Sequence, residues 1–116
     1  MSKCAKTINW SGGTHVFDLA SPRASWMLQQ RQAPFPGQYG DTPAACLRRF
    51  DEGVYSPTDI EAIFRIALIG GGLSENEADR LVSQHVRGEP IAENAVIAAN
   101  VLYNLFTGAE NVSTSA

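Results

Sequence analysis

Three consecutive glycines, Gly70-Gly71-Gly72, divide the middle of this 116-residue chain. The residues before them place apolar side chains at helical spacing: Ile60, Ile63, Phe64, Ala67 and Leu68. Directly after them, Ser74 and Glu77 have the spacing of a capping box, in which the two residues bind each other's backbone N–H groups at a helix start. The sequence therefore predicts a helix that stops at the triplet and a second helix that begins at Ser74.

A glycine-rich segment can also form a phosphate-binding loop, and the residues around the triplet argue against that alternative. A phosphate loop follows a strand and usually carries a lysine and a hydroxyl residue after its glycines. Here a helical pattern comes before the triplet and no lysine comes after it. We therefore interpret the triplet as a helix stop with a flexible joint.

Serine or threonine followed by proline marks the start of three predicted helices, because the hydroxyl caps the helix and proline suits its first position. These starts are Ser21-Pro22, Thr42-Pro43 and Ser56-Pro57. The first helix is expected to run to about Gln32 and the second from Ala44 to Asp51. In the third, Asp59 completes a capping box and Glu61 is expected to pair with Arg65 four residues later.

The last predicted helix runs from about Ile91 to Phe106, directly after Pro90, with Glu93 and Asn94 in its first turn. Apolar residues occupy most of its circumference, and the polar residues form a narrow stripe: Glu93, Asn100, Asn104 and Thr107. Such a helix is either enclosed by the domain or shared with a partner. Ile97 and Val101 lie on or near the stripe, so we expect them to be exposed and to bind a partner or a second copy.

Residues 6–19 predict a β-hairpin, because Ser11-Gly12-Gly13 separates two short β-forming segments. Ile8 and Phe17 are its expected inward residues. The expected fold is thus mostly α (α+β), with this hairpin packed on a bundle of about five short helices. We expect a single domain over residues 1–110 and a disordered polar tail over residues 111–116.

Composition argues against several classes of function. The net charge of −3 and only nine Lys and Arg residues give no basic face for nucleic acid. Cys4, Cys46, His15 and His85 are scattered, so neither a metal site nor a catalytic group with a partner is indicated. We expect no cofactor and no enzymatic activity.

The N-terminal residues contain no apolar segment of the kind found in export signals, and no apolar run is long enough to span a membrane. The expected compartment is therefore the bacterial cytoplasm.

Trp26, Arg48 and Arg49 form a second candidate partner-binding group, since tryptophan and arginine are common at binding hot spots. The alternative is a core tryptophan and arginines whose stems lie along a helix surface.

Several segments together resemble the gene transfer agent proteins that are grouped with phage tail assembly chaperones and tail tube proteins. They are Pro43–Phe50, Ile66–Gly72, Ala78–Val82 and Pro90–Asn94. The order and spacing of these segments agree with the family pattern over nearly the whole chain. The segment from Gln32 to Asp41 looks longer than the family pattern.

The resemblance implies a role in tail morphogenesis, and three hypotheses remain open. As a chaperone, the chain would bind the tape-measure protein or the tail tube protein during assembly and then leave. A conventional tube subunit is disfavoured, because one hairpin supplies too few strands to close a sheet-lined ring. As a structural component, such as a tail connector or a minor tail or tube-associated subunit, it would stay in the particle. A DNA-binding regulator is the third, which the acidic charge disfavours.

Overall fold

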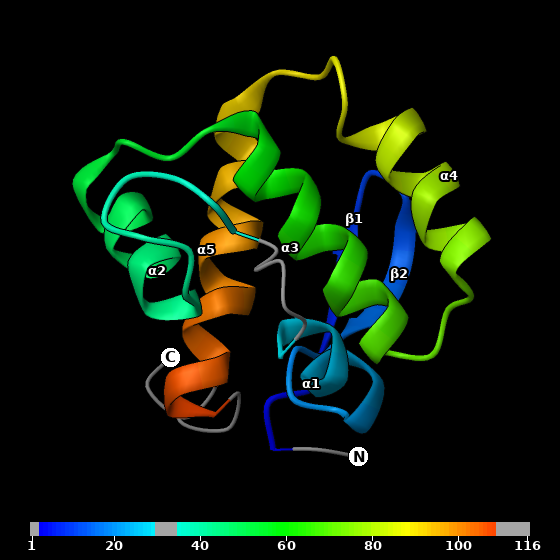
Figure 1. Cartoon of the computed structure of the whole chain (residues 1–116). Coiled ribbons are helices and arrows are strands. Elements are labelled where there is room, and N and C mark those ends of the chain that lie inside the picture. Colours follow the sequence, from blue (N-terminus) through cyan, green and yellow to red (C-terminus); the bar gives the residue numbers. More distant parts are fainter. Residues whose placement is uncertain (1–2, 30–34, 109–116) are drawn as a thin grey trace.

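Helix α3 (Pro57–Gly70) lies at the centre of the fold in the computed structural model, which describes residues 3–29 and 35–108. It packs against α1 (Pro22–Leu28), α4 (Glu75–His85), α5 (Ile91–Thr107) and strand β2 (Gly13–Phe17). Strand β1 (Lys6–Trp10) pairs with β2, and α2 (Pro43–Glu52) packs on α5 (Figure 1). This arrangement confirms the predicted fold class, a hairpin followed by five helices within the described residues. The predicted tail at 111–116 lies outside them.

The hairpin is antiparallel and pairs Trp10 with Gly13, which leaves Ser11 and Gly12 as its turn. Phe17 is buried as expected, whereas Ile8 is only half-buried. Trp10 is the buried residue of this hairpin that the sequence analysis missed. Its ring lies against Phe17 and Phe64 with centroids 5.8 and 5.0 Å apart, so it ties the hairpin to α3.

The predicted helix starts are present. Ser21, Thr42 and Ser56 each accept a hydrogen bond from the backbone N–H three residues later, and each is followed by proline. Ser56 and Asp59 form a complete capping box. Helix α1 ends at Leu28, earlier than the expected Gln32, and α4 ends at His85.

Each glycine of the triplet meets a different requirement. A Cβ on Gly70 would lie 1.9 Å from the carbonyl oxygen of Asp18, and one on Gly71 would lie 1.9 Å from that of Val16. Gly72 has a φ of +119° and follows the last turn of α3. The N–H groups of Gly72 and Leu73 bind the carbonyls of Ile69 and Leu68, which is a Schellman ending. The triplet therefore ends α3 and also lets its end pack directly on the backbone beside β2.

The residues that the sequence singled out at the starts of α4 and α5 act mainly in local structure. Ser74 caps α4 by accepting from the N–H of Glu77, but the carboxylate of Glu77 accepts from the Ser74 hydroxyl rather than from its backbone N–H. Pro90 occupies the N-cap position of α5 and Glu93 is exposed in its first turn. The Asn94 side chain is buried and donates to the His85 carbonyl at 3.2 Å, which joins α5 to the end of α4.

The expected pair of Glu61 with Arg65 is wrong. Arg65 instead binds Glu75 and Asp79 of α4, and Glu61 binds Arg87, which follows α4. The charged face of α3 thus pairs across to its neighbour, because α4 lies close enough to offer carboxylates from another element.

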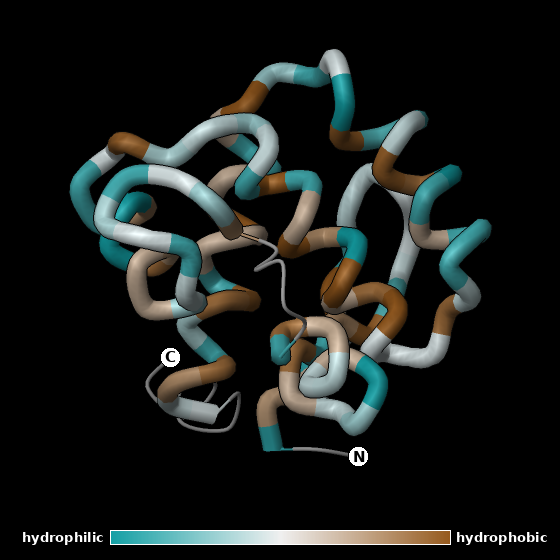
Figure 2. The backbone as a smooth tube through the Cα atoms, in the orientation of Figure 1, coloured by the Kyte–Doolittle hydropathy of each residue, from teal (hydrophilic) through white to brown (hydrophobic). Residues whose placement is uncertain are grey.

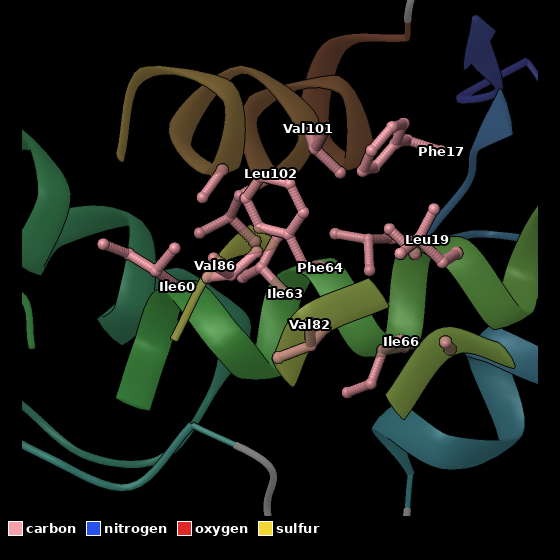
Figure 3. Close-up of a cluster of buried hydrophobic side chains, with 14 of the residues drawn as sticks. Phe17, Leu19, Ile60, Ile63, Phe64, Ile66, Val82, Val86, Val101 and Leu102 are labelled. Carbon is pink, nitrogen blue, oxygen red and sulfur yellow. The ribbon is translucent and has the colours of Figure 1, made fainter. Parts of the chain in front are cut away.

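The core lies between α3, α4, α5 and β2, and it includes all five apolar residues that repeat at helical spacing before the triplet. Figure 2 shows brown, hydrophobic segments along α3 and teal segments on the outer side of α4. In Figure 3, Val101 and Leu102 of α5 point toward Phe17 and Phe64. Across residues 3–29 and 35–108, none of the helices has the length and apolarity that a membrane crossing requires.

Candidate partner-binding surface

Arg49 is buried, with only 2% of its surface exposed, so it cannot serve as the surface residue that the sequence suggested. Its Nε and Nη2 atoms donate to the two carboxylate oxygens of Asp59 at 3.0 and 2.8 Å. Nη1 donates to the carbonyls of Gln38 and Gly40, each at 2.9 Å, and Nη2 also donates to that of Phe35 at 2.7 Å. Every N–H of this guanidinium therefore has an acceptor, and Arg49 fixes the loop before α2 against the start of α3.

Arg48 is exposed and belongs to a separate surface group on α2. Its Nε donates to Glu52 at 2.9 Å, and its guanidinium lies 3.8 Å from the centre of the Tyr39 ring. The Tyr39 hydroxyl also donates to Glu52. Hydrogen bonds from Tyr39 and Arg48 lower the pKa of the Glu52 carboxyl, and the bond to Glu52 raises the pKa of Arg48. Arg48 is therefore already engaged by its neighbours, although its outer face is open to solvent.

Trp26 is 68% exposed, the most exposed of the large apolar side chains in the described part of the chain. It lines a hollow of about 320 Å³ between α1 and the start of α4, together with Pro22, Arg23, Met27 and Glu75. We call this the Trp26 hollow. Neither Arg48 nor Arg49 lines it, so the predicted group of Trp26 with the two arginines is not assembled. Two of the residues beside Trp26 in this hollow could have been predicted from the sequence, because Arg23 and Met27 lie in the same helix, α1.

Val101 is buried and Ile97 is partly buried, which corrects the expectation that both are exposed. The error concerns which side of α5 faces the core. Asn104, a member of the presumed solvent-facing stripe, is itself buried, so the core takes in that edge of the helix. The exposed large apolar residues of α5 are Ile91, Val96, Tyr103 and Phe106.

A second hollow, of about 250 Å³, lies where α3, α4 and α5 meet, and the sequence analysis did not anticipate it. Ile60, Val86 and Ile91 provide its apolar lining, and the Glu61–Arg87 ion pair stands on its rim. Gly88, which has a φ of +81°, lies in the turn after α4 and also lines this hollow.

Both histidines contact the buried Trp10 ring, and Cys46 is buried. His15 accepts a hydrogen bond from the Trp10 indole N–H at 2.9 Å, and His85 lies edge-on to the same ring. Burial raises the pKa of the Cys46 thiol to about 12, which keeps it protonated and unreactive at neutral pH. Within residues 3–29 and 35–108, no three His, Cys, Asp or Glu side chains are grouped as metal ligands would be.

Comparison with known proteins identifies a family. The model of the family described as "Phage tail tube protein, GTA-gp10" matches residues 4–108, which is nearly all of the chain and includes both hollows and α5. No curated protein and no solved structure matches.

Proposed function

Because the chain belongs to the phage tail tube protein family GTA-gp10, we propose that it acts in tail assembly as a chaperone for the tape-measure protein. In this proposal the chain binds a helical segment of the tape-measure protein in the host cytoplasm and keeps it soluble. Tube subunits then polymerise around the tape-measure protein and the chaperone leaves. The role is one of binding, without turnover of a substrate.

The observation that carries the proposal is the small amount of strand in a chain of a tail tube family. A subunit that lines a tube must supply enough strands to close a sheet around the channel. The described residues supply two five-residue strands in one hairpin, and helices make up most of the rest. This composition supports a helper of tube assembly over a conventional tube subunit.

The Trp26 hollow is the surface we propose for the tape-measure protein. A large exposed tryptophan beside a hollow is typical of an interface hot spot, where a partner's apolar side chain fills the space and covers the ring. Met27 adds an adaptable apolar wall, and Arg23 and Glu75 provide charges of both signs at the rim. These features suit one face of an amphipathic helix.

The test is co-expression with the tape-measure protein of the same gene cluster, followed by co-purification. We expect the tape-measure protein to be soluble only with this chain and to elute with it. Trp26→Asp should abolish the complex, whereas the control Val54→Asp, at a residue that is 43% exposed before α3, should leave it intact. A wild-type chain that neither binds nor solubilises the tape-measure protein would refute the proposal.

The second candidate is a component that remains in the particle and contacts the tail tube protein, and the family's own description favours it. Mass spectrometry of purified particles separates the two functions. A retained component should be present in a fixed ratio to the tube subunit, and a chaperone should be absent or present in traces.

A further inference from the structure

One face of α5 carries a row of apolar side chains that are exposed except for Ala99 at its centre, which is half-buried. Its members follow one another at intervals of four, three, four and three residues: Ala92, Val96, Ala99, Tyr103 and Phe106. Val96 is 64% exposed, and Tyr103 and Phe106 are about half exposed. We call this row the α5 stripe. A 4-3-4-3 spacing keeps side chains on one line along a helix and is the spacing by which two helices pack as a coiled coil.

We propose that the α5 stripe binds the α5 stripe of a second copy, in an antiparallel pair with Ala99 on the twofold axis. In that register Tyr103 packs against Val96 of the other copy and Phe106 against Ala92. Each large side chain thus meets a small one, and the two alanines at the centre allow the helices to approach closely. A twofold interface requires this kind of self-complementary surface.

The parallel alternative fits poorly. It would set Tyr103 and Phe106 against their own counterparts at one end, and would leave Ala92 facing Ala92 across a gap at the other. It would also bring the two Glu93 carboxylates to the same end, whereas the antiparallel pair separates them. Antiparallel helices in addition align their dipoles favourably.

Charge does not oppose the pairing. The net charge of the chain is −3, but after Glu93 no charged residue occurs before the end of α5 at Thr107. Two copies can therefore meet along the stripe without placing like charges together. Asn100, exposed beside the stripe, supplies a polar edge that can bind water or the partner.

The area available predicts a weak dimer. Two half-exposed aromatic side chains contribute on the order of 100 Å² each, so with Val96 and the alanines the stripe offers roughly 400 Å² per copy. Together with the polar edge, two copies bury about 1,000 Å², the lower limit for a specific interface. We expect a dissociation constant on the order of 10–100 μM. This inference does not depend on the proposed function, because no residue of α5 lines the Trp26 hollow.

The first experiment is sedimentation velocity on the full chain from about 5 to about 500 μM. We expect the mass to rise from 12.5 kDa toward twice that value. Val96→Asp and Tyr103→Asp should each keep the chain monomeric, and Val54→Asp should dimerise like the wild type. Far-UV circular dichroism checks that each variant is folded. A wild-type chain that stays monomeric at the highest concentration would overturn the proposal.

Cysteine cross-linking then tests the register, in a Cys4→Ser background that retains the buried Cys46. Ala99→Cys should form a disulfide-linked dimer on mild oxidation. Neither Val96→Cys nor Tyr103→Cys should form a disulfide-linked dimer on its own. A mixture of the two variants should form one. Efficient cross-linking of Val96→Cys to itself, or none in any of the three cases, would contradict the antiparallel pair.

Discussion

A buried guanidinium such as that of Arg49 is shielded from water, so each of its N–H groups must find an acceptor within the protein. Asp59 supplies two acceptor oxygens and the loop before α2 supplies three backbone carbonyls. The bond to Asp59 raises the pKa of Arg49, so the group stays charged at any ordinary pH. A single residue therefore couples the loop, α2 and the first turn of α3, because Asp59 also belongs to the capping box of α3.

Arg49→Met should lower the free energy of unfolding by about 3–5 kcal/mol, because it leaves the Asp59 carboxylate buried without its partner. Arg49→Lys should not restore the wild-type value, since an ammonium cannot bind a carboxylate bidentately and reach three carbonyls as well. Urea denaturation monitored by tryptophan fluorescence measures the effect.

The matched control is Arg65→Met. Arg65 also binds two carboxylates, but its own side chain is 33% exposed and its partners are more exposed still, so the cost should be below about 1 kcal/mol. If the Arg49 and Arg65 variants lose equal amounts of unfolding free energy, burial does not determine the cost of removing the arginine.

At the scale of whole elements, α3 was the most predictable part of the chain and α5 the least. The apolar residues of α3 repeat with a clear helical period, and its ends carry a capping box and glycines, so local signals agree. Helix α5 is apolar on nearly all sides, and periodicity then cannot say which side faces the core. The polar residue Asn104 misled the prediction, because its burial depends on neighbours that are distant in the sequence.

The predictions of the surface sites were wrong for a similar reason, since they too depend on residues that are distant in the sequence. Adjacent arginines look alike in a sequence, and only the loop and α3 together make Arg49 a buried anchor while Arg48 remains outside. The exposure of Trp26 could be anticipated as one of two alternatives, but not the hollow beside it, since Glu75 comes from a distant part of the chain.

Asn104 also gives a prediction for α5. Both polar atoms of its side chain are buried and have no hydrogen-bond partner among the described residues. Asn104→Leu keeps the branching and the number of heavy atoms of the side chain, and it removes both unpaired polar atoms. It should therefore raise the free energy of unfolding by about 1–3 kcal/mol, since an unpaired buried amide costs about that much. Thermal and urea unfolding report the change.

Asn94→Leu is the control on the same helix. Asn94 is buried as well, but it donates to the His85 carbonyl, so its replacement should destabilise the protein. Loss of stability in both variants would count against an unpaired amide at position 104.

For the molecule as a whole, the buried Cys46 thiol makes stability depend on alkaline pH. Its pKa is raised by burial from 9.0 to about 12, so above pH 9.0 the unfolded chain loses this proton while the folded chain retains it. The unfolded state then binds fewer protons, and stability must fall as pH rises. The contribution is complete below pH 9.0 and is lost between there and about pH 12.

At pH 10 this group alone should cost about 1.4 kcal/mol relative to neutral pH. Urea denaturation at pH 7.5 and pH 10 measures the loss, and Cys46→Ala isolates the thiol, because other groups titrate equally in both proteins. The wild type should lose more stability than the variant; parallel losses would exclude Cys46 as the source.

The anchoring of the loop before α2 has a consequence for how this chain can vary in sequence. Arg49 holds the loop through the carbonyl oxygens of residues 35, 38 and 40, and a carbonyl is the same in every amino acid. The side chains of Pro36 and Gln38 face solvent and take no part in the anchorage. Those side chains can therefore be replaced while the backbone path of the loop is kept. The segment can thus present different side chains at the surface on the same backbone.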